Sequence, residues 1–108
     1  MRYSEFKARC RSGRIKPVVN EDQLMIYSGK IDDFDTVHKK VRNPSDRIDD
    51  EGIHHLVPIG YCRHSYYIAC PYCGEVHIHG RIGGYRVPHC SRSHGLSNYY
   101  IEEVTSNA

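Results

Sequence analysis

Apolar residues at helical spacing predict two helices in the first half of the chain. The first covers residues 4–10, with Ser4 as its N-terminal cap and Ser12 and Gly13 as its stop. The second covers residues 32–41, where Asp residues near the start suit the positive end of the helix dipole. A helical component is therefore expected ahead of a strand-rich remainder.

Short apolar runs bounded by Gly, Pro and Ser predict strands over much of the remainder. Pro58 interrupts one of these runs, and residues 16–20 form an extended entry. The polar residues 46–52 predict a surface loop. Residues 75–79 and 85–88 flank a glycine-rich turn, which predicts a β-hairpin. The predicted strands cover residues 23–27, 53–59, 66–69, 75–79, 85–88 and 98–104.

These elements predict an α+β fold in one small domain, with a β-rich, zinc-ribbon-like C-terminal half. Residues 1–52 are expected to hold a basic arm, a short helix and strand, and an acidic segment. Residues 53–108 are expected to form the ribbon-like β module. With 108 residues, two Phe, no Trp and nine Tyr, the chain has little apolar material for a core, so a metal ion would supply part of its stability.

The cysteines and the lack of targeting patterns bear on the compartment. No apolar run reaches about 18 residues, so no membrane span or membrane partner is expected. The chain also lacks the charged and apolar regions of a signal peptide. Its five cysteines, an odd number, favour thiol or metal chemistry in a reducing compartment, so a cytoplasmic location is expected. Cys10 and Cys62 lie outside the main cysteine cluster and are expected to be ordinary thiols.

Charge is unevenly distributed, although the formal net charge is only +2. Residues 1–16 are basic, residues 21–51 are acidic, and residues 52–108 are close to neutral and rich in His and Tyr. The basic arm can contact phosphate, or it can dock on the acidic segment. Both interpretations are open at the level of sequence.

The strongest chemical signal in the chain is a pair of cysteines in a tight turn. Cys70 and Cys73 are separated by two residues, so both thiolates can face one ion. The alternative is a redox dithiol, but the strand–helix context of a thioredoxin-like motif is missing. Cys90 is predicted as the third ligand, because the expected hairpin returns it to the first pair. The sequence therefore predicts one structural Zn²⁺.

The fourth ligand has several candidates. His94 is predicted, because a Cys-x₃-His spacing is in the usual range for zinc sites. His89 is a rival, although on a strand it would point to the opposite face from Cys90. His79 is a second rival. The strand that carries His77 and His79 leads away from the cysteine pair, which counts against either residue closing the site.

Alternation along the predicted hairpin puts one polar face together, because every second side chain of a strand shares a face. Such a face can bind a second divalent ion, act as general acid or base, or contact phosphate. It can equally be a polar sheet surface that faces solvent. The residues of this face are Glu75, His77, His79, Tyr85, Val87 and His89.

Three short pieces of this region are similar to a segment of small zinc-cluster proteins of actinobacteria and their phages. They are CPYC at residues 70–73, HxHG at residues 77–80 and RxxHC at residues 86–90. The resemblance implies a phage or mobile-element origin, a host cytoplasm as the setting, and a role for His79 and His89 beyond the surface. It implies no established activity. The family pattern has a polar residue, often His, where this chain has Tyr85.

The first functional hypothesis is a zinc-stabilised binding module that contacts nucleic acid or a nucleic-acid-handling protein. Arg side chains bind phosphate, and interleaved Tyr side chains can stack on unpaired bases. The near-zero net charge and the acidic segment count against this hypothesis. The nucleic-acid contacts expected from sequence are Arg9, Arg11, Arg14, Arg63, Arg81 and Arg86.

Two further hypotheses belong to other classes. Residues 53–59, with His54 and His55, are similar to the catalytic strand of HNH-type metal-dependent nucleases, although no convincing helix follows Asn98 to complete the pattern. In that case His55, His77 and His79 would be catalytic. The third hypothesis is a virion structural protein or an inhibitor of a host enzyme, which suits a Tyr-rich, charge-segregated chain. A non-enzymatic binding role is the prediction.

Overall fold

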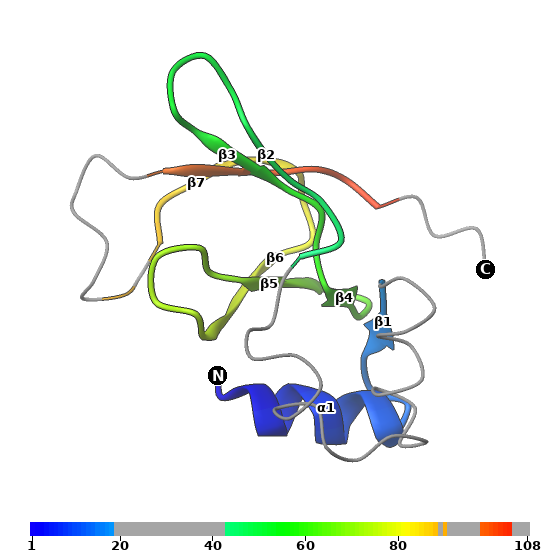
Figure 1. Cartoon of the computed structure of the whole chain (residues 1–108). Helices are drawn as coiled ribbons and strands as arrows, with labels where there is room; N and C mark the ends of the chain where they lie inside the picture. Colours follow the sequence, from blue (N-terminus) through cyan, green and yellow to red (C-terminus); the bar gives the residue numbers. More distant parts are fainter. Residues whose placement is uncertain (19–42, 89, 91–97, 105–108) are drawn as a thin grey trace.

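The computed structural model describes residues 1–18, 43–88, 90 and 98–104, which form three layers (Figure 1). Helix α1 (Tyr3–Arg11) is one outer layer. A middle sheet of four strands lies next to the helix, and an outer sheet of four strands lies on the other side of the middle sheet. No helix in these ranges is both long enough and apolar enough to cross a membrane. The fold is therefore α+β and β-rich, as predicted.

The middle sheet is antiparallel throughout. Its strand order is β1-β4-β5-β6, and β5 and β6 share the longest pairing, from Ser65↔Gly80 to Ala69↔Val76. The strands are β1 (Lys16–Pro17), β4 (Gly60–Tyr61), β5 (Ser65–Ala69) and β6 (Val76–Gly80).

The outer sheet contains the one parallel pair among the described strands. Its order is β2-β3-β8-β7, and β3 runs parallel to β8. The other two pairings are antiparallel. The strands are β2 (Asp46–Ile48), β3 (His54–Leu56), β7 (Gly84–Arg86) and β8 (Tyr99–Ile101).

Two apolar cores hold the three layers together. The first lies between α1 and the middle sheet, where Phe6 is fully buried against Tyr67 and Val76. The second lies between the two sheets, where Leu56 and Tyr99 of the outer sheet meet Ile68 of the middle sheet. Burying these side chains from both faces of the middle sheet supplies the main driving force for folding.

The helix α1 agrees with the sequence prediction, but its cap does not. The helix starts at Tyr3, with Arg2 at the cap position and no side-chain cap, so the predicted cap Ser4 lies inside the first turn. Burial of Phe6 holds this helix in place instead of a capping hydrogen bond. At the other end Ser12 caps the helix and Gly13 takes a positive φ of 83°, so the predicted stop is confirmed.

The loop predicted over residues 46–52 is wrong in its first half. Asp46–Ile48 forms β2, which pairs with β3 in the register Asp46↔Leu56, and only the residues after Ile48 turn. All of β2 is exposed, so no apolar alternation marks it, and the pairing with β3 alone makes it a strand. The predicted strands 53–59 and 98–104 contain β3 and β8, and the predicted strand 66–69 covers all of β5 except Ser65. The segments predicted at 23–27 and 32–41 lie outside the described residues.

The predicted hairpin between residues 75–79 and 85–88 is also wrong. β6 pairs with β5 of the middle sheet, and β7 pairs with β8 of the outer sheet, so the chain changes sheets between them. Alternation along a strand reports which face is buried but not which strand is the partner. The ribbon hairpin is therefore not formed, and neither is the polar face that joined Glu75, His77 and His79 to Tyr85 and Val87.

Candidate metal centre

The turn after β5 presents two cysteine sulfurs to the same space. The backbone N–H of Gly74 donates to the Cys70 carbonyl at 2.9 Å, and Gly74 adopts a positive φ of 79°. The N–H of Tyr72 donates to the Cys70 Sγ at 3.4 Å, and the N–H of Glu75 donates to the Cys73 Sγ at 3.5 Å. Such N–H groups favour thiolates, the form in which cysteine binds metal.

A buried amide fixes the strand residue just before this turn. The Asn43 side chain donates from Nδ2 to the Ala69 carbonyl at 2.7 Å and accepts the Ala69 N–H at Oδ1 at 2.8 Å. These two hydrogen bonds satisfy both backbone groups of Ala69, as a neighbouring strand would. Cys70, the next residue, therefore starts from a fixed position.

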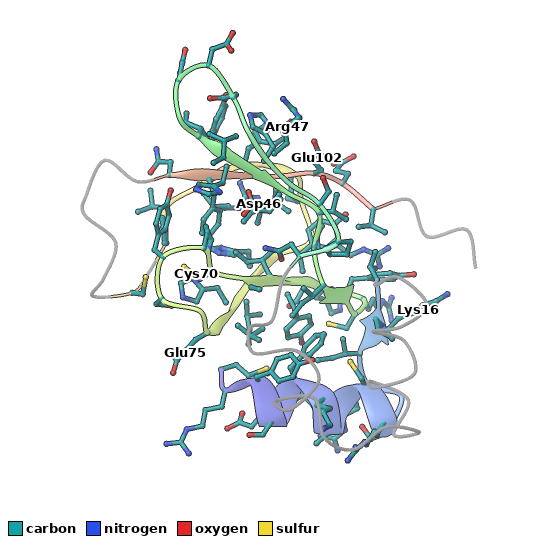
Figure 2. The ribbon with its side chains drawn as sticks, viewed as in Figure 1. Lys16, Asp46, Arg47, Cys70, Glu75 and Glu102 are labelled. Atoms are coloured by element: carbon teal, nitrogen blue, oxygen red, sulfur yellow. The ribbon has the colours of Figure 1, made fainter. Side chains whose placement is uncertain are left out.

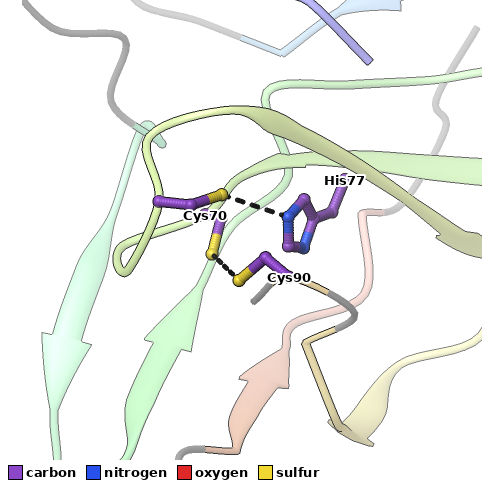
Figure 3. A group of neighbouring side chains, drawn as sticks. Cys70, His77 and Cys90 are labelled. Atoms are coloured by element: carbon purple, nitrogen blue, oxygen red, sulfur yellow. Dashed lines mark hydrogen bonds between the residues drawn. The ribbon is translucent and has the colours of Figure 1, made fainter. Parts of the chain in front are cut away.

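Four side chains gather here with their ligand atoms all within 4.8 Å of one another: Cys70, Cys73, His77 and Cys90. The Cys70 and Cys90 sulfurs are 3.9 Å apart, and the Cys73 Sγ lies 3.3 Å from the His77 Nε2. Figure 3 shows the labelled side chains turned toward one another. Tetrahedral Zn–S bonds of about 2.3 Å place two sulfurs about 3.8 Å apart, so the spacing fits one ion.

The chemistry of the donor set also fits zinc. Three thiolates and one imidazole form a closed set of the kind that structural zinc sites use, with no position left for water. Burial, with the neighbouring Cys73, raises the pKa of the Cys70 thiol above its ordinary value. A buried thiolate needs a cation to neutralise it, and a bound Zn²⁺ would supply that charge.

The position of His77 corrects one expectation from the sequence. The strand that carries it was expected to lead away from the cysteine pair. In the structure β6 returns antiparallel to β5, with His77 opposite Ile68, so the imidazole lies beside the inter-sheet core and reaches Cys73. His94 and His89, the predicted fourth ligand and its rival, lie outside the described residues. His79 is buried and does not belong to the group.

A hydrogen-bonded chain continues behind the imidazole of His77. Its Nδ1 lies 3.1 Å from the Tyr99 hydroxyl, and the same hydroxyl lies 2.5 Å from the His79 Nε2. With a metal on Nε2, the proton of His77 is on Nδ1 and is donated to the Tyr99 oxygen, so the Tyr99 hydroxyl donates to His79. Burial, with the nearby cysteines, raises the pKa of Tyr99, so this hydroxyl keeps its proton.

The cluster draws on both sheets. Cys70 follows β5 and His77 lies in β6 of the middle sheet, whereas Cys90 follows β7 of the outer sheet. Tyr99, from β8, adds a second contact from the outer sheet. An ion at this position would therefore cross-link the two layers.

The residues named for a nuclease lie on different faces. His55 donates a hydrogen bond from Nε2 to Asp49 Oδ2, at 2.8 Å, and it pairs across the outer sheet with Tyr100. His77 and His79 contact Tyr99. Tyr99 and Tyr100 are neighbours in β8, so their side chains point to opposite faces of the outer sheet. The structure therefore does not bring His55 together with His77 and His79. His54 bonds instead to Asp46, at 2.6 Å.

The predicted nucleic-acid contacts lie in three places. Arg9 and Arg11 occupy the last turn of α1, and Arg14 follows it. Arg63 lies in the exposed turn between β4 and β5, with Arg81 beside it. Arg86, in β7, donates to the carbonyls of Tyr85 and Ile82 at 2.8 and 2.7 Å.

Sequence reasoning missed Tyr99 as part of this site. Its only sequence signal is the apolar run Tyr99, Tyr100, Ile101, which predicts a strand but does not reveal which side chain is buried or which group it bonds to. No protein-family model, curated protein or solved structure matches this chain.

Proposed function

We propose that the chain is a zinc-stabilised binding protein whose partner is a nucleic acid. The observation that carries the first part is the Cys70, Cys73, His77 and Cys90 group, which fits one tetrahedral ion. Because four protein ligands leave no open position, the ion would stabilise the fold and would not activate water. The proposed role is therefore binding and not catalysis.

The support for nucleic acid comes from arginines whose side chains are exposed or half-buried. Arg63 is exposed, and Arg9 and Arg81 are half-buried at the same end of the middle sheet. Guanidinium groups bind phosphate with paired N–H donors. From the resemblance to small zinc-cluster proteins, which implies no activity, we propose only the cytoplasm as the setting and a phage as the source.

Affinity for oligonucleotides tests the nucleic-acid part. Fluorescence anisotropy would follow a labelled single strand and its duplex across a salt series, with zinc-loaded and chelated protein. We expect binding that weakens as salt rises, because phosphate contacts release counterions, and that is lost when zinc is removed. No binding of either oligonucleotide at low salt would contradict the proposal and would leave a protein partner as the next class to test.

A further inference from the structure

The turn between β4 and β5 carries a basic surface assembled from three separate parts of the chain. We propose that this surface binds the phosphate backbone of a nucleic acid, an inference that rests on the function proposed above. We call it the turn surface. It consists of Arg9, Arg14, Lys16, Arg63 and Arg81.

Arg81 is fixed on one side of the turn. Its guanidinium donates to the Cys62 carbonyl at 3.2 Å and lies 4.5 Å above the centre of the Tyr61 ring. Its backbone N–H donates to the His64 carbonyl at 3.1 Å. These contacts hold the charge of Arg81 beside the turn at a low cost in side-chain entropy when a ligand binds.

Three residues of the N-terminal segment, Arg9, Arg14 and Lys16, lie on the side of the turn that faces α1. The Arg9 guanidinium lies close enough to the Tyr67 hydroxyl to oppose the burial that raises the pKa of that group, and this hydroxyl lies 3.7 Å from the Cys62 Sγ. Arg14 follows directly, with its N–H bonded to the Arg9 carbonyl at 3.0 Å. Lys16 pairs with Tyr61 across β1 and β4. Arg9 and Arg81 therefore flank Cys62 from two sides.

The turn itself favours negative charge. Burial acts to raise the pKa of the Cys62 thiol, but hydrogen bonds from the His64 backbone N–H and the Tyr67 hydroxyl lower it further than burial raises it. The arginines that flank Cys62, Arg9 and Arg81, would supply N–H donors to an anion bound at this turn. The exposed Arg63 side chain extends from the same turn.

Apart from Glu5, which lies one helical turn before Arg9, most acidic side chains of the described residues lie away from the turn surface. The ion pairs recorded among them are Arg47–Glu102, His54–Asp46 and His55–Asp49, all in the outer sheet or its turn. None involves a member of the turn surface. Figure 2 shows Asp46, Arg47 and Glu102 on the outer sheet, well separated from Lys16 beside β1. Glu103, which follows β8, lies beside Gly83 in the segment between β6 and β7 that begins at Arg81. The separation of charge favours an anionic ligand at the turn surface.

The test compares two double variants that remove the same charge. Arg63→Gln with Arg14→Gln alters exposed members of the turn surface, and Arg2→Gln with Arg47→Gln alters exposed arginines outside it. Each would be titrated with the labelled oligonucleotides, after zinc content and thermal midpoint are shown to match the unchanged protein. We expect the turn-surface pair to lose about tenfold in affinity and to reduce the salt slope by about one per lost phosphate contact.

The outcomes separate this inference from the function on which it rests. If the control pair keeps nearly full affinity while the turn-surface pair loses it, the surface is established. If the unchanged protein binds but both pairs weaken equally, the turn surface is overturned and the nucleic-acid function stands. If the unchanged protein binds neither oligonucleotide at low salt, the function itself fails and the inference fails with it.

Discussion

The Tyr99 hydroxyl is the residue-scale feature that links the metal centre to the rest of the molecule. It lies between His77 and His79, which belong to a different sheet, and its ring is fully buried in the inter-sheet core. A hydrogen bond to the second ring nitrogen of a ligand imidazole fixes its orientation and its tautomer in the metal-free protein. One side chain thus serves both packing and metal geometry.

Replacing His77 by Ala tests the fourth ligand. We expect zinc affinity to fall by at least about 100-fold, because a ligand should cost more than the 10- to 100-fold typical of residues behind it. Competition with a chromophoric chelator measures the affinity. His94→Ala is the matched control, and it should retain zinc. The reverse pattern, with His77→Ala loaded and His94→Ala empty, would return the fourth position to His94.

Tyr99→Phe keeps the buried ring and removes only the hydroxyl. We expect about 10- to 100-fold weaker zinc binding, because His77 loses the acceptor that orients it. Tyr66→Phe is the control, since Tyr66 is also buried in the inter-sheet core and its hydroxyl accepts one hydrogen bond, from the Val104 N–H at 3.0 Å. Equal zinc affinity in the two variants would show that Tyr99 acts through packing alone.

At the residue scale, the sequence predicts contacts between residues that are close together in the chain. The spacing of Cys70 and Cys73 is short enough for the turn itself to bring both sulfurs together. His77 could not be predicted, because its approach to the cysteines depends on β6 folding back along β5. The sequence pattern of residues 75–79 indicates a strand but does not say whether it pairs with residues 65–69 or with residues 85–88.

At the scale of helices and strands, the main difference between prediction and structure is which strands pair with each other. The predicted positions of α1, β5 and β8 agree with the structure because each contains apolar residues, visible in its own sequence, that the fold buries. β2 has no such stripe, and the partner of β7 is distant in sequence. The pairings of β2 with β3 and of β7 with β8 depend on how the whole chain packs, which the sequence of each strand does not show.

The fit of α1 on the middle sheet depends on a glycine. A Cβ at Gly60 would lie 2.9 Å from the Phe6 Cζ and 2.9 Å from the Ile15 Cγ2. We expect Gly60→Ala to lower the free energy of unfolding by about 1–3 kcal/mol through overpacking, as measured by urea denaturation. Gly80→Ala, with open space around the added Cβ, should change stability little. Equal effects would mean that α1 is not packed closely on β4.

The turn between β2 and β3 is closed by one carboxylate. Asp49 Oδ1 accepts the N–H groups of Glu51 and Ile53 at 2.9 and 3.0 Å, and Oδ2 bonds to His55. The Ile53 N–H, followed by the His55 side chain, lowers the pKa of Asp49. A lowered folded-state pKa contributes stability above the ordinary Asp value of about 3.9, and that stability is lost as pH falls through the folded value.

Asp49→Asn should therefore be less stable than the unchanged protein near neutral pH, and the difference should shrink as pH falls below about 4. Urea denaturation at a series of pH values measures it. Asp50→Asn, at the exposed neighbouring position, is the control and should show little difference at any pH. A difference for Asp49→Asn that stays constant down to low pH would contradict the role given to its charge.

On the scale of the whole molecule, the metal centre and the inter-sheet core serve the same purpose. Side chains such as Leu56 and Ile68 pack the outer sheet on the middle sheet, and an ion bound by Cys70, His77 and Cys90 would link the same two sheets. A small domain buries too little apolar surface to be very stable alone, so binding energy from an ion becomes folding energy. The turn surface proposed to bind nucleic acid lies at the opposite end of the middle sheet from this cluster.

Native mass spectrometry of the purified protein, before and after treatment with a chelator, tests the central claim most directly. We predict one zinc ion per chain, its removal by the chelator with loss of the cooperative unfolding transition, and no bound zinc in Cys73→Ala. A chain that carries no metal, or a Cys73→Ala variant that keeps its zinc and melts like the unchanged protein, would contradict the account.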